Sequence, residues 1–123
     1  MSEFSIEFRI RCRAEFADSV ISSMGLTASH KRYYDEKFVW GYNGTDEYDK
    51  PVYWKDLEEG LIFVMAKLES KLETIQDLAK QHECIWWCGH FLDEPNDGSV
   101  LSSHCLERLA EFGIDYFLDT YCK

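Results

Sequence analysis

The chain has 123 residues, 46% of them apolar and 15% aromatic, so we expect one hydrophobic core and a single globular domain over residues 1–123. Its 13 basic and 23 acidic side chains give a net charge of −10, and the whole excess lies in residues 32–123. This charge excludes nucleic acid and anionic membrane as favoured partners, because both are negative, and it favours a basic partner.

The first two elements are expected within residues 4–25. In residues 4–12 apolar and polar side chains alternate, and this period of two predicts a half-buried strand. Apolar residues then recur at helical spacing from Phe16 to Met24, and Gly25 follows at a position suited to left-handed backbone. We therefore expect a strand followed by a short helix.

The middle of the chain contains a weak pattern and then a strong one. Residues 27–51 are rich in Tyr, Asp, Gly and Asn, so residues 38–42 are either a strand leading into a hairpin at Asn43-Gly44 or an irregular loop. Asp56 and Glu59 then resemble a capping box before apolar residues at helical spacing up to residue 79. We expect one long helix or two with a break near Ser70. Gly60 should weaken the first turn by about 1 kcal/mol relative to alanine.

The last third contains two further strands and a helix. Residues 82–92 predict a strand, and residues 93–99 are prone to turns. Ser102 or Ser103 should cap a helix buried through Leu106, Leu109 and Ala110 and ended by Gly113, and residues 114–122 predict a last strand. This pattern indicates an α+β fold: a single two-layer domain with one sheet of about four to five strands and helices packed mainly on one face.

Residues 82–92 contain four side chains of the kind that bind zinc: His82, Cys84, Cys88 and His90. On a strand they share one face, with Cys84 and Cys88 about 13 Å apart, which is too far for one ion with bonds of about 2.3 Å. Cys88 and His90 could share a metal if His104 and Cys105 completed the site, but the spacing matches no ordinary zinc module. We expect a structural strand, no metal and no cofactor.

The sequence carries no signature of catalysis. It lacks the G-x-x-x-x-G-K-[ST], G-x-G-x-x-G, H-E-x-x-H and G-x-S-x-G motifs, so we expect that the protein is not an enzyme. Five cysteines, odd in number and irregularly spaced, indicate reduced thiols. Neither a membrane-spanning segment nor an export signal is expected, so the protein should be cytoplasmic.

Several segments resemble a known bacterial family in their order and spacing. They are FRIRC (8–12), SVISSMGLTAS (19–29), the isolated Trp40, DLEEGLIFVMAKLESKLETIQDLAK (56–80) and LSSHCLERLAEFGIDYFLDTY (101–121). Together they are similar to the family catalogued as domain of unknown function 4279, over nearly the whole chain. The resemblance implies a small solitary α+β protein without an assigned activity. Some members are encoded near polymorphic toxin genes, which suggests an immunity protein, and the resemblance implies no catalytic residues.

Two functions from different classes stay open. In the first, the chain is an immunity protein that binds a basic toxin, often a nuclease, with acidic residues steering association and aromatic residues anchoring the contact. The expected partner-binding residues are Asp35, Glu36, Tyr42, Asp46, Glu47, Tyr48, Asp49, Tyr53, Asp93, Glu94 and Asp97. In the second, the chain is a small-ligand or metal-binding domain in which Trp86, Trp87, Cys88 and His90 line a pocket. The oligomeric state is left open.

Overall fold

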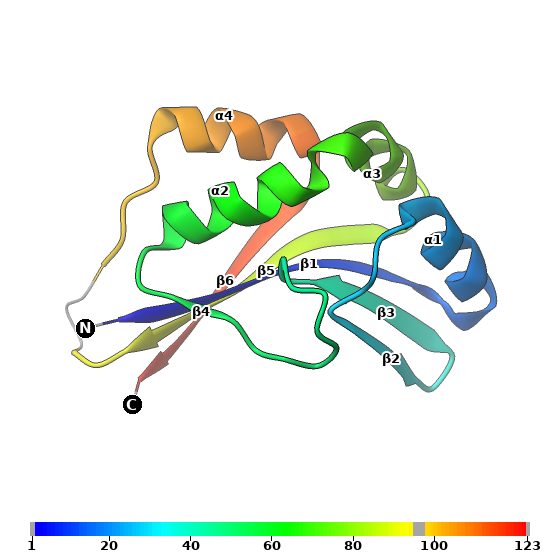
Figure 1. The fold of residues 1–123 in the computed structure, drawn as a ribbon, viewed down its shortest axis with the longest axis horizontal. Coiled ribbons are helices and arrows are strands. Elements are labelled where there is room, and N and C mark those ends of the chain that lie inside the picture. The colour runs from blue at the N-terminus through cyan, green and yellow to red at the C-terminus, as the bar shows by residue number, and fades with distance from the viewer. Residues whose placement is uncertain (1, 95–97, 123) are drawn as a thin grey trace.

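A computed structural model describes residues 2–94 and 98–122 of the chain (Figure 1). In chain order the elements are β1 (Glu3–Arg13), α1 (Ala17–Met24), β2 (His30–Tyr34), β3 (Lys37–Tyr42), β4 (Tyr53–Trp54), α2 (Leu57–Leu68), α3 (Leu72–Ala79), β5 (Glu83–Leu92), α4 (Ser103–Phe112) and β6 (Asp115–Cys122). Two short 3-10 turns, η1 (Ala14–Phe16) and η2 (Glu69–Lys71), precede α1 and separate α2 from α3.

The strands form one mixed sheet. The hydrogen-bonded order is β2-β3-β1-β5-β6, and the short β4 pairs with β1 beyond the end of β3. All pairings are antiparallel except that of β5 with β6, which is parallel. The chain passes from β5 to β6 through α4. The α+β class is confirmed, with six strands in place of the four to five expected. β2 and β4 escaped prediction because β2 is almost wholly exposed and β4 has only two residues.

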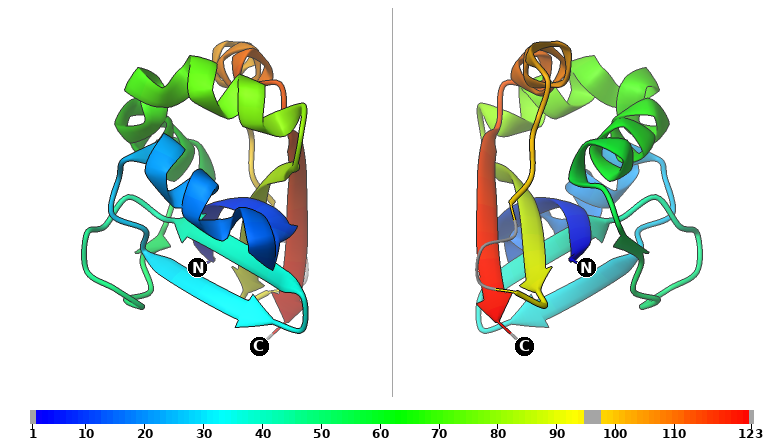
Figure 2. Two further views of the ribbon diagram at one scale, coloured as in Figure 1. Left: turned by 90° about the vertical axis from the view of Figure 1, so that its right-hand side faces the viewer. Right: turned by 90° about the vertical axis from the view of Figure 1, so that its left-hand side faces the viewer.

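The described helices α1 to α4 lie on one side of this sheet (Figure 2). β1 shows the reason, because its apolar side chains from Phe4 to Cys12 are buried at every second position and the intervening polar ones are partly exposed. Trp40 of β3 and Trp86 of β5 are fully buried on the same side, and both rings pack edge-on against Phe8. The hydrophobic core therefore lies between the helices and one sheet face, and none of the described helices covers the other face.

The expected helix boundaries are confirmed by their caps. The Asp56 side chain accepts a hydrogen bond of 3.0 Å from the Glu59 N–H, and Ser102 accepts one of 3.1 Å from the Cys105 N–H. Gly25 and Gly113 follow α1 and α4 in the left-handed conformation, with φ of 61° and 68°. Of the two alternatives for residues 57–79, the second is correct, because η2 separates α2 from α3 at Ser70. These boundaries depend on a few neighbouring residues, which is why the sequence predicted them.

Two details of burial were predicted wrongly. α4 buries Cys105, Leu109 and Phe112, whereas Leu106 is 51% exposed and Ala110 is exposed. The helical period was right, but the stripe that faces the sheet is rotated because Phe112 packs against Trp86. Phe16, expected to begin the buried stripe of the first helix, lies in η1 and is exposed.

Gly60 has a packing role that its helix propensity does not show. A Cβ at this position would lie 2.7 Å from Cγ of Trp54 and still closer to the end of the Ile6 side chain. The glycine therefore lets the first turn of α2 approach β1 and β4 closely. Glycine weakens the helix locally, but it avoids a clash with Ile6 and Trp54 that any larger side chain would cause.

Candidate functional site

The uncovered face of the sheet carries charged and aromatic side chains. Because side chains alternate along a strand, the neighbours of the core residues point to this face. They include Glu7 and Arg9 of β1, His30 of β2, and Trp87 and Phe91 of β5. We call this surface the open face.

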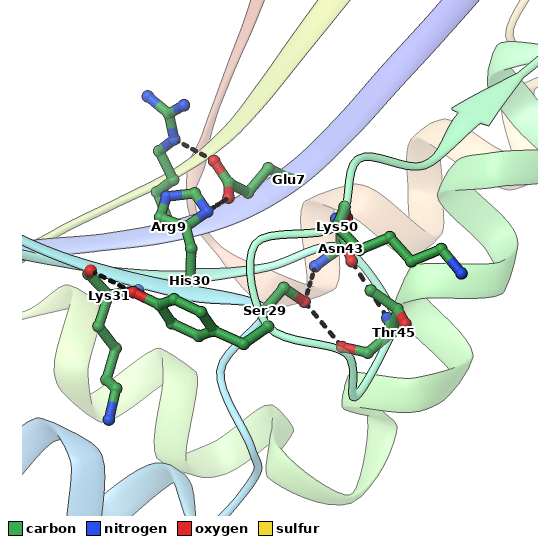
Figure 3. Close-up of polar contacts among 9 residues, drawn as sticks. Glu7, Arg9, Ser29, His30, Lys31, Asn43, Thr45 and Lys50 are labelled. Atoms are coloured by element: carbon green, nitrogen blue, oxygen red, sulfur yellow. Dashed lines mark hydrogen bonds and ion pairs between the residues drawn. The ribbon is translucent and has the colours of Figure 1, made fainter.

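At its centre the Glu7 carboxylate joins two basic side chains (Figure 3). One oxygen pairs with Nε of Arg9, and the other lies 2.5 Å from Nδ1 of His30. Burial alone would raise the pKa of the Glu7 carboxyl, but the hydrogen bond from His30 and the charge of Arg9 together hold it below its ordinary value. Glu7 and His30 meet across Gly41, where a Cβ would lie 2.5 Å from the Glu7 oxygen and 2.7 Å from the His30 ring.

An aromatic strip lies beside this cluster. The Arg9 guanidinium lies over the Trp87 ring, 4.5 Å from its centroid. Trp87 contacts Phe117 of β6 with centroids 4.4 Å apart, and Phe91 stacks on Tyr121 at 5.0 Å. Arginine–aromatic and aromatic–aromatic pairs of this kind hold their side chains in defined positions. The open face is thus an ordered surface.

The loop of residues 43–52 connects β3 to β4, and both of these strands pair with β1. Loop residues line the same hollow as side chains of the open face, so the loop borders that face. Tyr42 ends β3 opposite Phe8 of β1, and Tyr53 begins β4 opposite Ser5 of β1. The ten residues between them leave the sheet as a loop beside Ile6 and Glu7, the two β1 residues between these pairings.

Ser29 holds this loop in place (Figure 3). Its hydroxyl accepts a hydrogen bond of 2.9 Å from the Asn43 N–H and donates one of 2.9 Å to the Thr45 carbonyl. Its own carbonyl accepts a bond of 2.6 Å from the Asp49 N–H. Ser29 is only 1% exposed, and the two bonds of its hydroxyl are partly buried. One buried serine therefore fixes the loop at three points.

Further contacts order the middle of the loop. The Tyr48 hydroxyl donates to the Lys31 carbonyl at 2.9 Å, and Nδ2 of Asn43 donates to the Lys50 carbonyl at 3.0 Å. Lys50 forms an ion pair of 2.8 Å with Glu47. Asp49 has a φ of 60°, a left-handed conformation that aspartate tolerates better than most residues. The backbone that carries the acidic side chains is thus well defined.

A hollow of about 260 Å³ lies between this loop and the open face. Its lining combines the Glu7 cluster, the aromatic strip and the loop: Glu7, Arg9, His30, Lys50, Tyr53, Trp87 and Phe91 are among the residues. Both signs of charge and three aromatic rings face one space. This arrangement can receive a polar group that also has an apolar surface.

The predicted contact residues fall into three groups. Asp46, Glu47, Tyr48 and Asp49 lie together in the 43–52 loop, and Tyr53 follows at the start of β4. Asp35 and Glu36 form the turn between β2 and β3, at the other end of β3. Asp93 and Glu94 follow β5, where Glu94 lines a separate hollow with Ser2 and Lys55. Asp97 lies outside the described residues.

Tyr42 does not lie on the surface as expected. It is 3% exposed, and its ring stacks on Trp40 with centroids 5.9 Å apart. It ends β3 on the core side of the sheet, so its ring is part of the hydrophobic core. The sequence suggested a loop residue because the strand and the loop meet at this tyrosine.

The residues weighed as metal ligands or as pocket lining do not share one surface. Cys88 and Trp86 are fully buried in the core, and His90 is stacked on Phe4 at 4.2 Å, whereas Trp87 faces the open side. Burial raises the pKa of the Cys88 thiol to about 12. Within residues 2–94 and 98–122, no three His, Cys, Asp or Glu side chains gather in a way that could hold a metal ion.

The Glu7, Arg9 and His30 cluster was missed by sequence reasoning. Glu7 and Arg9 did fall on the polar face of the predicted first strand, so an alternation of acid and base on that face was the available signal. His30 had no comparable signal, because β2 lacks an apolar period. The pairing of β2 with β3, together with that of β3 with β1, brings His30 beside Glu7.

The fold and this surface together define a small α+β domain whose sheet has one helix-covered face and one open face beside an ordered acidic loop. Residues 20–123 match the family described as Domain of unknown function (DUF4279), and the chain belongs to this family. No curated protein and no solved structure gives a significant match to the chain. None of the helices described is long and apolar enough to cross a membrane.

Proposed function

We propose that the chain is a cytoplasmic, two-layer immunity protein that binds and neutralises a cognate basic bacterial toxin, such as a nuclease, without catalysis of its own. The observation that supports this most is the 43–52 loop, which presents Asp46, Glu47, Tyr48 and Asp49 on a backbone held by the buried Ser29. A loop that is ordered before binding loses less conformational entropy when the partner arrives.

Charge and exposed aromatic area divide the work of recognition in this proposal. The acidic side chains of a protein with a net charge of −10 attract a basic partner and raise the rate of encounter. Tyr48, 59% exposed, and Tyr53, 54% exposed, offer rings that a partner surface can bury. The toxin is then blocked because the bound domain covers its active surface.

Co-expression with the product of the adjacent upstream gene is the direct test. The proposal expects rescue of growth and co-elution of a stable complex. If the toxin still kills the cells and no complex elutes, the proposal is wrong.

A charge-reversal experiment then locates the interface. Asp46→Lys with Glu47→Lys should slow association at low salt by about an order of magnitude or more, because steering depends on these charges. Asp49 is left unchanged, since its left-handed φ of 60° suits aspartate better than lysine. Glu73→Lys with Asp77→Lys on α3 changes the net charge equally and should have a much smaller effect. Equal slowing by both variants would mean that only total charge matters.

A complex whose association is unchanged by the loop variant would place the interface elsewhere. Asp93 and Glu94, which follow β5, are then the next residues to reverse together with Asp97 of the same predicted turn, and Asp35 and Glu36 between β2 and β3 come after them.

A second candidate function is small-ligand binding in the hollow beside the loop. It is supported by the convergence of the Glu7 cluster with Tyr53, Trp87 and Phe91 on one space. Ionic strength separates the two functions: the on-rate for a basic toxin should fall steeply with salt, whereas binding of an uncharged ligand in the hollow should change little. Trp87→Ala should abolish ligand binding and leave the loop charges intact.

A further inference from the structure

The two edge strands of the sheet, β2 and β6, differ in how well they are protected against pairing with another chain. β2 forms one edge with five residues, and it carries Lys31 and Arg32. Short length and basic side chains are devices that keep an edge strand from pairing with another chain. β6 forms the other edge with eight residues and contains no lysine, arginine, proline or glycine. The β6 edge therefore lacks most of this protection.

β6 also exposes apolar surface on both of its faces. Tyr116 and Leu118 align with Trp86 and Cys88 on the helix side, whereas Phe117 and Tyr121 align with Trp87 and Phe91 on the open side. These four residues of β6 remain between 36% and 45% exposed, although they lie beside β5. The parts left exposed are large enough to pack against a further strand.

We propose that β6 pairs antiparallel with β6 of a second copy of this chain, about a twofold axis at Leu118. A twofold axis perpendicular to the sheet keeps the helices of both copies on one side and the open faces on the other. Such an isologous contact is closed, so it yields a dimer and not a fibre. The free N–H and C=O groups along β6 would then be paired.

The charges of β6 select this register. In an antiparallel pair, directly opposed residues have their side chains on the same face of the sheet. With a twofold axis perpendicular to the sheet, a residue of β6 can therefore oppose only its own copy or a residue an even number of positions away in the second chain. An axis at Asp119 would place the two Asp119 carboxylates opposite each other, and an axis at Phe117 would oppose Asp115 to Asp119. Like charges directly opposite destabilise a strand pair.

The axis at Leu118 avoids both conflicts and keeps nearly the whole strand paired. Leu118 opposes Leu118 of the second copy, Phe117 opposes Asp119, Tyr116 opposes Thr120, and Asp115 opposes Tyr121. Axes nearer either end of β6 would pair fewer residues. The dimer would join the two open faces into one continuous surface with two copies of the 43–52 loop.

The oligomeric state of the purified chain is the first test. Light scattering after size exclusion should give twice the 14.5 kDa mass of the chain. Leu118→Lys should yield a folded monomer, because two lysines would meet at the axis. Ile62→Lys on α2 is the matched control, since Ile62 is 41% exposed against 37% for Leu118, and it should stay dimeric. A wild-type protein that is monomeric at its highest soluble concentration would overturn the proposal.

A cysteine experiment tests the register without depending on the stability of a lysine variant. In a Cys122→Ser background, Leu118→Cys places two cysteines opposite each other with Cα atoms about 5 Å apart, which allows a disulfide. Thr120→Cys leaves its two sulfurs on residues about 14 Å apart along the strands. Oxidation should therefore cross-link the first variant rapidly and the second hardly at all. Equal cross-linking of both, or cross-linking of the second alone, would refute the pairing about Leu118.

Discussion

Ser29→Ala is the sharpest test of how the acidic loop is held. The change removes a hydroxyl that accepts from the Asn43 N–H and donates to the Thr45 carbonyl, both at 2.9 Å. Each such bond contributes about 1 kcal/mol net, so the variant should lose about 2 kcal/mol of unfolding free energy. For a domain of this size that corresponds to a fall of roughly 8 °C in Tm. Ser23→Ala, on the exposed side of α1, should stay within about 0.5 kcal/mol of the wild type.

Hydrogen exchange gives the same variant an internal control. The Asn43 amide loses its acceptor and should exchange faster in Ser29→Ala. The Asp49 amide keeps its bond of 2.6 Å, because its acceptor is the backbone carbonyl of residue 29. Under the proposed function, association with a basic toxin should also weaken, although no acidic residue has changed. A stability loss below about 0.5 kcal/mol together with unchanged exchange at Asn43 would refute the assigned role of Ser29.

Three further predictions concern the sheet and the thiols. Glu7→Gln should cost about 2 kcal/mol at pH 7, since two basic partners lose the carboxylate. Because the folded pKa of Glu7 is lowered, its contribution is present above the ordinary glutamate pKa of about 4.3 and is lost as the pH falls further, so wild type and variant should converge in acid denaturation curves. Gly60→Ala should gain about 1 kcal/mol of helix propensity but lose about 1–3 kcal/mol through overpacking against Trp54. Denaturant titrations should therefore show a net loss of unfolding free energy of up to about 2 kcal/mol. Ala66→Gly, at an exposed position of α2, measures the helix-propensity part alone. A gain in stability at Gly60→Ala would contradict this balance. Of the five cysteines, only Cys122 is exposed, so a thiol reagent at pH 8 should modify one thiol quickly in the native protein and all five after unfolding.

The candidate site was predictable only in part. The composition of residues 27–51, rich in Tyr, Asp, Gly and Asn, pointed to an irregular segment, and Asp46, Glu47, Tyr48 and Asp49 lie in its loop. Its anchor, Ser29, is fourteen residues before Asn43 and shows no motif. Tyr42, next to the loop, lies in the core because it belongs to the last position of β3. Composition thus indicated the loop, whereas contacts distant in sequence determined its shape.

The sequence by itself determined the elements whose causes are local. The alternation in β1, the caps at Asp56 and Ser102, and the stops at Gly25 and Gly113 depend on side chains and backbone groups within about four residues, so they could be read along the chain. Only the tertiary structure decided the strand order, the pairing of β2 and β4, and the meeting of Glu7 with His30 across Gly41. Strand pairing joins residues far apart in sequence, and the polar side chains of an uncovered face leave no period that would reveal their partners.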